Sequence, residues 1–462
     1  MIADLKPYAK YKESGSKWLG AIPTTWGVQN LRTLIRRQNE RNRSDLPLLS
    51  VAREKGVFVR SLTDAEENHN VIPEDLSNYK VAKDGNLVIN KMKAWQGSMG
   101  IAPCDGIVSP AYFVFDLCIK NHMFAQRLLR SKPYVAHFAQ ASDGVRVGQW
   151  DLSIFGMRQI PVLLPDEQEQ DAIVRFLDWA NGRLDRAIRA KRKVIALLNE
   201  QKQAIIHRAV TRGLDPSVPL KPSGIPWLGD IPRHWDVRRA KYLYREVNDR
   251  SSDGSEELLS VSHITGVTPR SQKNITMFKA ASYVGHKLCS PGDLVVNTMW
   301  AWMGALGVST HAGIISPAYA VYRPFRPYDI VGEYMDGLLR SKPYVSNIIC
   351  RSTGLRASRL RLYPEQFFRL PIILPPAEEQ QKIVQSIQLE TSEQDAKISC
   401  LEREIDLLRE YRTRLVADVV TGKLDVRAAT AKLPVEEQAI EPVELVEDDS
   451  EMIEDEITEP VG

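Results

Sequence analysis

The residues of this sequence that come nearest to a catalytic motif are two copies of the tetrapeptide Ser-Pro-Ala-Tyr, which begin at Ser109 and Ser316. Adenine-amino methyltransferases carry Asn or Asp, two prolines, and Tyr or Phe, and the first residue accepts a hydrogen bond from the base. Here serine holds the first position and alanine the third, and no glycine-rich strand-to-helix turn for S-adenosylmethionine precedes either copy. We therefore predict that each copy is a strand followed by a packed turn.

Other catalytic and metal-binding patterns are missing from the sequence. It contains no G-x-x-x-x-G-K-[ST], H-E-x-x-H or G-x-S-x-G motif, and its eight histidines lack metal-ligand spacing. The acidic pairs Asp166-Glu167 and Glu378-Glu379 precede helical patterns, where the helix dipole already favours them. We therefore expect no catalytic residue, no metal site and no cofactor bound by this chain.

Composition describes an ordinary globular protein, with 43% hydrophobic and 26% charged residues among 462. Five scattered cysteines without a C-x-x-C pair are typical of reduced thiols, and no apolar run approaches a membrane span or a signal-peptide core. Residues 435–462 hold twelve of the 58 acidic residues and no Lys or Arg, so the remainder of the chain is basic. We expect a cytoplasmic protein with a polyanionic partner.

Internal repetition is the strongest signal in the sequence, and chance does not produce so many ordered matches. The second half repeats, in order, these phrases of the first: S-G-x-x-W-L-G-x-I-P-x-x-W from Ser14 and Ser223; N-x-M-x-A-W-x-G-x-x-G from Asn90 and Asn297; S-P-A-Y; L-L-R-S-K-P-Y-V from Leu128 and Leu338; G-x-R ending at Arg146 and Arg356; and the pairs Glu169-Gln170 and Glu379-Gln380. The period is far too long for a solenoid repeat, so the sequence predicts two similar domains in tandem.

Each copy mixes short β-rich runs with helical patches, which predicts a mixed α/β fold. In the first copy we expect strands near 86–90, 107–115 and 160–164 and helix around 122–138. Pro165 ends the last strand, and Asp166 or the acidic residues after it can cap the helix that follows.

A long heptad-patterned helix follows each copy, from about 177 to 209 and again near 387 to 419. Basic residues predominate on the first helix and acidic residues on the second, and parallel pairing would bring Lys202 and Arg412 together. We therefore expect an antiparallel coiled coil about 50 Å long, with one domain at each end. The seam is Leu184, Ile188, Ile195, Leu198 and Ile205 on the first helix, and Ile398, Leu401, Ile405, Leu408 and Leu415 on the second.

The resulting partition has five parts. Residues 1–165 and 216–375 form the two domains, 166–215 and 376–426 the spacer helices, and 427–462 an acidic tail. We expect the tail to be disordered and solvated, and an autoinhibitory mimic of phosphate is the alternative.

Taken together, the repeated phrases make the chain resemble a type I restriction–modification specificity (S) subunit over about residues 8–426, in both halves. The resemblance implies two target-recognition domains that each read one half of a bipartite DNA site. It implies a helical spacer that sets the gap and docks two methyltransferase (M) subunits, and restriction–translocase (R) subunits in the full enzyme. S-adenosylmethionine would be bound by the M subunits, and ATP and Mg by the R subunits.

The residues that read DNA are inferred from comparison of the two halves. Positions that the halves share build the fold or contact phosphates, whereas positions that differ are free to read different bases. Arg146 and Arg356 are shared candidates for phosphate or groove contacts, and a structural salt bridge is the alternative for each. Trp95 and Trp302 are shared and expected to pack. The divergent candidates are Arg53, Lys55, Lys91, Lys93 and Gln149 in the first half, and His263, Trp300, Ser358, Arg359 and Arg361 in the second. Gln149 suits adenine, and Arg359 or Arg361 suits guanine.

Two other classes of function remain open from the sequence. A methyltransferase or nuclease that acts alone would modify or cut DNA without a partner. A coiled-coil scaffold that joins two protein-binding modules would not bind random duplex at low salt. The target bases and the length of the gap are not encoded in any pattern of the sequence.

Overall fold

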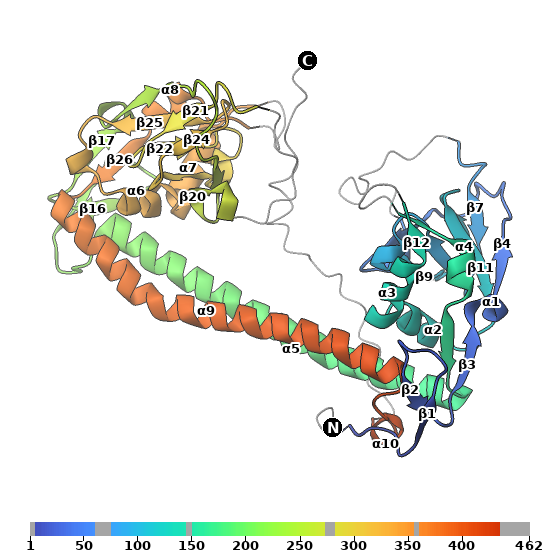
Figure 1. Ribbon diagram of the computed structural model, residues 1–462. Helices are drawn as coiled ribbons and strands as arrows, with labels where there is room; N and C mark the ends of the chain where they lie inside the picture. The colour runs from blue at the N-terminus through green and yellow to red at the C-terminus, as the bar shows by residue number, and fades with distance from the viewer. Residues whose placement is uncertain (1–4, 61–74, 145–149, 273–281, 355–359, 435–462) are drawn as a thin grey trace. The chain divides into compact units, whose positions relative to one another are not determined.

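The computed structural model describes residues 5–60, 75–144, 150–272, 282–354 and 360–434 (Figure 1). The chain divides into two compact units. The described parts of 1–191 and 402–440 make the first unit, and the described part of 192–401 lies in the second. Each unit thus contains one predicted domain together with one half of each long helix. The acidic segment 435–462 lies outside the described residues.

The first unit is built on a four-stranded antiparallel sheet in the order β4-β11-β8-β9. Its strands are β4 (Ile35–Gln38), β11 (Tyr112–Leu117), β8 (Leu87–Asn90) and β9 (Met99–Ile101). Two-stranded antiparallel pairs surround it: β1 (Tyr11–Glu13) with β2 (Ala21–Pro23), β3 (Gly27–Asn30) with β14 (Pro161–Leu164), β5 (Leu49–Ala52) with β6 (Gly56–Val59), β7 (Lys80–Ala82) with β10 (Gly106–Val108), and β12 (Ser142–Asp143) with β13 (Asp151–Leu152). The short helices are α1 (Leu31–Leu34), α2 (His122–Leu129), α3 (Lys132–Gln140), α4 (Ile154–Arg158) and the 3₁₀ turn η2 (Ala94–Gln96).

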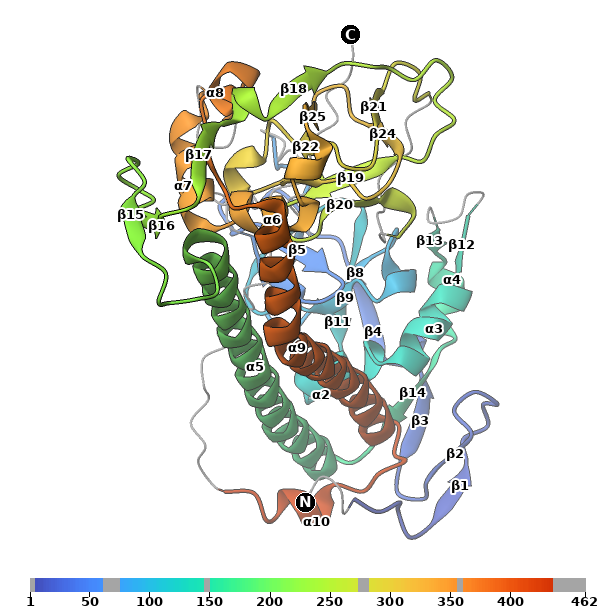
Figure 2. The same ribbon diagram turned by 90° about the vertical axis from the view of Figure 1, so that its left-hand side faces the viewer.

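The second unit repeats this topology except for the β12–β13 pair, and its sheet order is β18-β25-β22-β23. Strands β18, β25 and β22 of this sheet are labelled in Figure 2. These strands are β18 (Tyr244–Val247), β25 (Ala320–Pro324), β22 (Leu294–Val296) and β23 (Leu306–Val308). The outer pairs are β15 (Leu220–Pro222) with β16 (Asp230–Pro232), β17 (Asp236–Arg239) with β26 (Pro371–Leu374), β19 (Leu259–Ser262) with β20 (Gly266–Pro269), and β21 (Lys287–Cys289) with β24 (Gly313–Ile315). Its helices are α6 (Gly332–Leu339), α7 (Lys342–Arg351), α8 (Pro364–Phe368) and the 3₁₀ turns η3 (Ala240–Tyr242), η4 (Arg270–Gln272), η5 (Ala301–Met303) and η6 (Pro327–Asp329). The mixed α/β fold and the predicted duplication are both confirmed.

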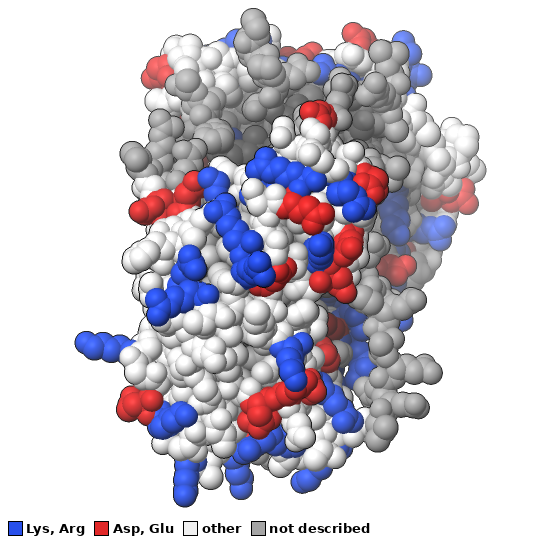
Figure 3. Space-filling model, turned by 90° about the vertical axis from the view of Figure 1, so that its right-hand side faces the viewer, with Lys and Arg blue, Asp and Glu red and all other residues white. Residues whose placement is uncertain are grey.

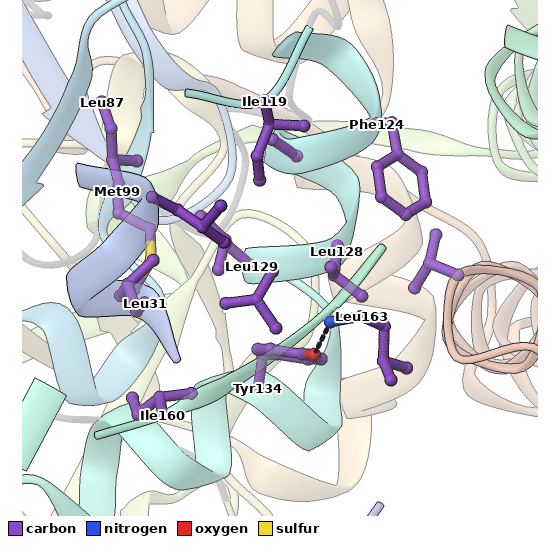
Figure 4. Packing of buried hydrophobic residues seen from close by; sticks show 14 of the residues in the cluster. Leu31, Leu87, Met99, Ile119, Phe124, Leu128, Leu129, Tyr134, Ile160 and Leu163 are labelled. Carbon is purple, nitrogen blue, oxygen red and sulfur yellow. Dashed lines mark hydrogen bonds between the residues drawn. The ribbon is translucent and has the colours of Figure 1, made fainter. Parts of the chain in front are cut away.

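The identical segment L-L-R-S-K-P-Y-V forms the centre of each core. Leu128, Leu129 and Tyr134 are fully buried, and the Tyr134 hydroxyl accepts a hydrogen bond from the Leu163 amide at 3.1 Å (Figure 4). The equivalent Tyr344 hydroxyl accepts from the Ile373 amide at 3.3 Å. A buried phenol needs such a partner, so both the shape and the polarity of this segment are fixed by packing.

The long helices are α5 (Glu167–Arg212) and α9 (Ala377–Val420). As predicted, Asp166 caps α5, because its carboxylate accepts from the Glu169 amide at 2.8 Å. Gln170 and Gln380, which follow the repeated glutamates, each donate to the carbonyl of the preceding proline, Pro165 or Pro375, at 2.9 Å. The shared Glu-Gln pair is therefore a device that joins the last strand to the helix.

Within each unit α5 and α9 lie side by side and antiparallel. In the first unit Asp185 pairs with Arg412 and Lys191 with Glu404, and in the second Lys202 pairs with Asp395 and Arg208 with Glu390. Partners that rise in number on α5 fall on α9, which confirms the predicted antiparallel coil. All ten seam residues are buried or half-buried. The placement of one domain at each end stays a prediction.

The end of one long helix packs on the repeated S-G-x-x-W-L-G-x-I-P-x-x-W motif in each unit. In the first unit, α9 ends near Gly422, where a Cβ atom would lie 2.6 Å from Pro23 and 3.1 Å from the Trp26 ring. In the second, α5 ends before Gly213, where a Cβ atom would lie 3.3 Å from Trp235. In the first unit the N-terminal strand region also contacts the segment after α9, where Lys6 forms a β-bridge with Asp425 and the Tyr11 hydroxyl donates to the Gly422 carbonyl at 3.3 Å. The short helix α10 (Arg427–Thr430) follows.

Candidate nucleic-acid interface

The divergent positions lie on loops that occupy equivalent places in the two units. We call 53–55 and 263–265 the hairpin loops, because they join β5 to β6 and β19 to β20. The tryptophan loops are 91–98 and 297–305, which follow β8 and β22. The return segments are 150–152 and 360–362.

Hydrogen bonds between residues of the repeated motif hold the tryptophan loop in its turn. Asn90 accepts from the Met92 amide at 3.2 Å, and the Trp95 indole donates to the Met92 carbonyl at 3.2 Å. The second unit repeats both contacts, since Asn297 accepts from Met299 at 3.3 Å and Trp302 donates to the Met299 carbonyl at 2.9 Å. Trp95 and Trp302 are thus engaged in the turn itself, which agrees with the predicted packing role.

The strands that follow the hairpin loop and the tryptophan loop pass close to each other, β6 beside β9 in the first unit and β20 beside β23 in the second. A Cβ atom on Gly100 would lie 2.9 Å from the Val57 amide nitrogen, and one on Gly307 would lie 3.2 Å from the Gly266 Cα atom. The last glycine of N-x-M-x-A-W-x-G-x-x-G is therefore required by this close approach of two backbones.

The return segment pairs with the start of the tryptophan loop. The Leu152 amide donates to the Lys91 carbonyl at 2.9 Å, and the Leu362 amide donates to the Thr298 carbonyl at 2.9 Å. In each unit the return segment therefore contacts the tryptophan loop, and the strand after that loop packs on the strand after the hairpin loop.

The predicted residues fall into two groups in the structure. Arg146, Gln149, Arg356, Ser358 and Arg359 lie in 145–149 and 355–359, outside the described residues. The structure brings the others together on the three loops: Arg53, Lys55, Lys91 and Lys93 in the first unit and His263, Trp300 and Arg361 in the second.

These side chains differ in how far they are already engaged. Arg53, Lys55, Lys93 and Arg361 are exposed, although Arg53 also pairs with Glu54 at 3.4 Å and the Lys55 ammonium lies 5.4 Å from the centre of the Phe58 ring. Lys91 forms a 2.8 Å ion pair with Asp151, and the Trp300 ring stacks on Trp302 with centroids 5.7 Å apart. His263 is half-buried. The exposed cations are the side chains best placed to reach a ligand.

The electrostatic surroundings of the tryptophan loop are basic in the first unit. The pKa of Lys80 is lowered, first by burial and then by the nearby charges of Arg37, Arg41 and Lys91. For the equivalent Lys287, Glu246 opposes the lowering of the pKa that burial and Arg250 cause. Figure 3 shows basic side chains gathered among acidic ones on one face of the molecule, above a band of uncharged surface. Lys80 therefore has more basic neighbours than Lys287, which has Glu246 beside it.

Sequence comparison missed the function of these two lysines. The Lys80 ammonium donates to the carbonyl of Tyr112 at 2.6 Å, and the Lys287 ammonium donates to that of Tyr319 at 2.7 Å. These tyrosines end the two Ser-Pro-Ala-Tyr copies, so the structure confirms that this motif is a packed turn. A lysine repeated at equivalent places in both halves was the signal that could have revealed the contact.

The described residues contain neither a metal-binding cluster nor a membrane-spanning helix. They include no group of three or more His, Cys, Asp or Glu residues arranged to hold a metal ion. Among the described helices, none is both long and apolar enough to cross a membrane.

Comparison with known proteins gives a structural match and no sequence match. No protein-family model matches the sequence, and no curated protein matches it. A chain from a structure of the type I R-M system, solved to explain complex assembly and conformational transition, matches with a TM-score of 0.57 at 16% identity, covering 87% of this chain and 99% of that one. The chain shares the fold of a type I restriction–modification subunit.

Two further structures match less well. The HsdS subunit from Thermoanaerobacter tengcongensis has a TM-score of 0.40 at 16% identity, covering 89% of this chain and 100% of that one. The type I restriction–modification S subunit from M. genitalium has a TM-score of 0.33 at 11% identity, covering 85% and 96%. The assignment of the fold rests on the first match alone.

Proposed function

We propose that this chain is the DNA sequence-specificity subunit of a type I restriction–modification complex. Each unit reads one half of a bipartite site, and the helical spacer sets the gap between the halves. The observation that carries the proposal is that the two units share one fold but carry different residues on equivalent loops. The hairpin loop of the first unit is Arg53-Glu54-Lys55, and the equivalent loop of the second unit is His263-Ile264-Thr265.

Such an arrangement suits readout of DNA sequence. Shared contacts hold the frame, and divergent side chains at the loop tips can meet different base edges in the major groove. The exposed cations Arg53, Lys55 and Lys93 also suit phosphate contacts, which supply most of the affinity for DNA.

The chemistry belongs to partners in this proposal. Two methyltransferase subunits that bind S-adenosylmethionine dock on the spacer helices, and restriction–translocase subunits that use ATP and Mg join the full enzyme. The chain itself is a non-catalytic subunit. The fold shared with a subunit of a type I system supports this assignment.

The experiment that tests the function is a genome-wide map of methylated adenines in the host, with and without this gene. We expect the deletion to remove methylation from one bipartite motif and to leave all other methylated motifs unchanged. Complementation with the intact gene should restore that motif. An unchanged map would contradict the proposal.

A further inference from the structure

One arginine in each unit holds the hairpin loop by its backbone. Arg130, at the C-terminal end of α2, donates through Nη2 to the carbonyls of Arg53 and Glu54, both at 2.7 Å. Arg340, at the end of α6, donates through Nη2 to the carbonyls of His263 and Ile264, both at 2.5 Å. The same contact therefore recurs across two separate copies of the fold.

The hairpin is shaped to receive the guanidinium. Gly56 and Gly266, which follow the loops, have φ angles of 74° and 67°, a region that glycine adopts without strain. A Cβ atom at Gly56 would lie 2.9 Å from Arg130 Nη1, and one at Gly266 would lie 3.3 Å from Arg340 Nη1. The glycine thus serves both the turn and the space that the arginine fills.

A second side chain, one turn earlier on the same helix, makes a further contact next to each hairpin loop. Gln126 accepts from the Ile101 amide at 2.8 Å, and Asp336 accepts from the Val308 amide at 2.6 Å. These contacts fix the strand, β9 or β23, that runs beside the hairpin. Helix, hairpin and strand are therefore joined at one point in each unit.

The contacts to the hairpin involve only its backbone. The side chains at 53–55 and 263–265 differ at every position, yet the carbonyls are held in the same way. A contact of this kind sets where the loop lies without restricting which residues it carries. Both arginines are half-buried, and burial lowers the pKa of both guanidinium groups.

We propose that Arg130 and Arg340 are positioning residues. Each holds the backbone of the divergent hairpin loop of its unit in the same position, so that the side chains of that loop face DNA. The inference rests on the proposed function only where it concerns DNA; the positioning itself concerns the chain alone. Arginine suits the task because its rigid planar group places Nη2 within reach of both carbonyls while Nη1 lies beside the glycine, whereas lysine offers a single flexible point charge.

The first test measures the loop without DNA. Arg130→Lys and Arg340→Lys are made in the full chain, and amide hydrogen exchange is followed by mass spectrometry. We expect exchange to rise over 53–57 in the first variant and over 263–267 in the second. Arg127→Lys is the matched control, since Arg127 lies on the same helix but pairs with Asp178. Unchanged exchange in the hairpins would overturn the proposal.

The second test measures how well the same variants, now co-expressed with the methyltransferase subunits of the proposed function, discriminate between DNA sequences. Duplexes carry the methylated motif with a substitution in one half or the other, and affinity is measured across salt concentrations. We expect Arg130→Lys to reduce discrimination at the half read by the first unit by about 10-fold, and Arg340→Lys to do so only at the other half. The salt dependence should stay that of the wild type, because neither arginine contacts phosphate.

Other outcomes distinguish the positioning role of the arginines from the proposed function of the chain. A wild-type complex without any preference among duplexes would refute the proposed function, while the exchange result would still decide the positioning. A preserved preference in both variants would overturn the positioning of a reading loop. A reduced salt dependence would also overturn it, because the arginine would then be a phosphate contact. Gly56→Ala offers a second variant if Arg130→Lys unfolds, and it should raise exchange in the same hairpin.

Discussion

The two units share one backbone fold, but equivalent residues in them form different hydrogen bonds. In the second unit Glu379 accepts from the Trp235 indole at 3.0 Å and bonds the His234 ring at 2.7 Å. In the first, the equivalent Glu169 accepts instead from the Tyr8 hydroxyl at 2.7 Å, and within the described residues the buried Trp26 indole nitrogen has no hydrogen-bond partner. Apolar packing is thus kept between the copies, while the hydrogen bonds around it have changed.

The same contrast appears beside the hairpins and in the sheets. Gln126 of the first unit corresponds to Asp336 of the second, a neutral side chain against an ionisable one. Asn86 and Asp116 of the first correspond to Asp293 and Arg323 of the second, and both pairs are hydrogen-bonded. Duplicated domains therefore tolerate a change in polar partners, and the buried Asn86 and Asp293 each still have one.

The largest expected effect is on the shared core. Leu128→Ala and Leu338→Ala each remove a fully buried side chain from equivalent positions. We expect each to lower the free energy of unfolding of its own unit by about 2–5 kcal/mol. Denaturant titration followed by hydrogen exchange in each unit measures this. A loss confined to one of the two variants would break the equivalence of the cores.

A smaller effect distinguishes the two tryptophans that contact the helix ends. Trp235→Phe removes the hydrogen bond to Glu379, whereas Trp26→Phe removes only ring area. We expect Trp235→Phe to cost more free energy of unfolding than Trp26→Phe, by about 1–3 kcal/mol, because its acceptor is charged. Equal losses in the two variants, measured by the same titration, would argue against this difference between the units.

The third prediction concerns pH. Burial raises the pKa of Asp336 from 3.8 to about 6, although the Val308 amide and Arg340 oppose the shift. Between these two values the folded state holds more protons than the unfolded state, so the second unit should lose stability as pH rises from about 4 to 6. Asp336→Asn should remove this part of the pH dependence. Stability curves of the two proteins that stay parallel over this range would contradict the prediction.

The smallest effect is expected on the surface of the coiled coil. Lys202 and Asp395 pair across α5 and α9, but the Asp395 side chain is 55% exposed. We expect Lys202→Ala to cost about 0.2–1 kcal/mol, with the loss reduced at high salt. A double-mutant cycle with Asp395→Ala measures the coupling, and a value above this range would show that the pair matters more than its exposure allows.

Much of the fold could be predicted because the repeated sequence phrases and the periodic spacing of apolar residues follow directly from how the side chains pack. The heptad spacing of Leu184, Ile188 and Ile195 identified the seam, and the charges of Lys202 and Arg412 predicted its direction. The boundaries were less accurate. The helical patch 122–138 is two helices, because Ser131 and Pro133 start a new one. By contrast, α5 begins at Glu167, directly after the predicted cap Asp166.

The candidate site was predicted less completely, for a physical reason. Divergence between the halves located the loops that carry Lys91, Lys93 and Trp300, but it cannot find a residue that acts on a backbone. Arg130 and Arg340 lie within the longest unchanged segment, where comparison of side chains predicts packing. Their contacts with carbonyls 76 and 77 residues away follow from the fold alone.

The central claim is that each unit reads its own half of one DNA site. The most direct measurement replaces residues 1–165 with the corresponding domain of another subunit of this fold and maps the methylated adenines that result. We expect one half of the recognised motif to change while the other half and the gap stay the same. A motif altered in both halves would contradict the claim.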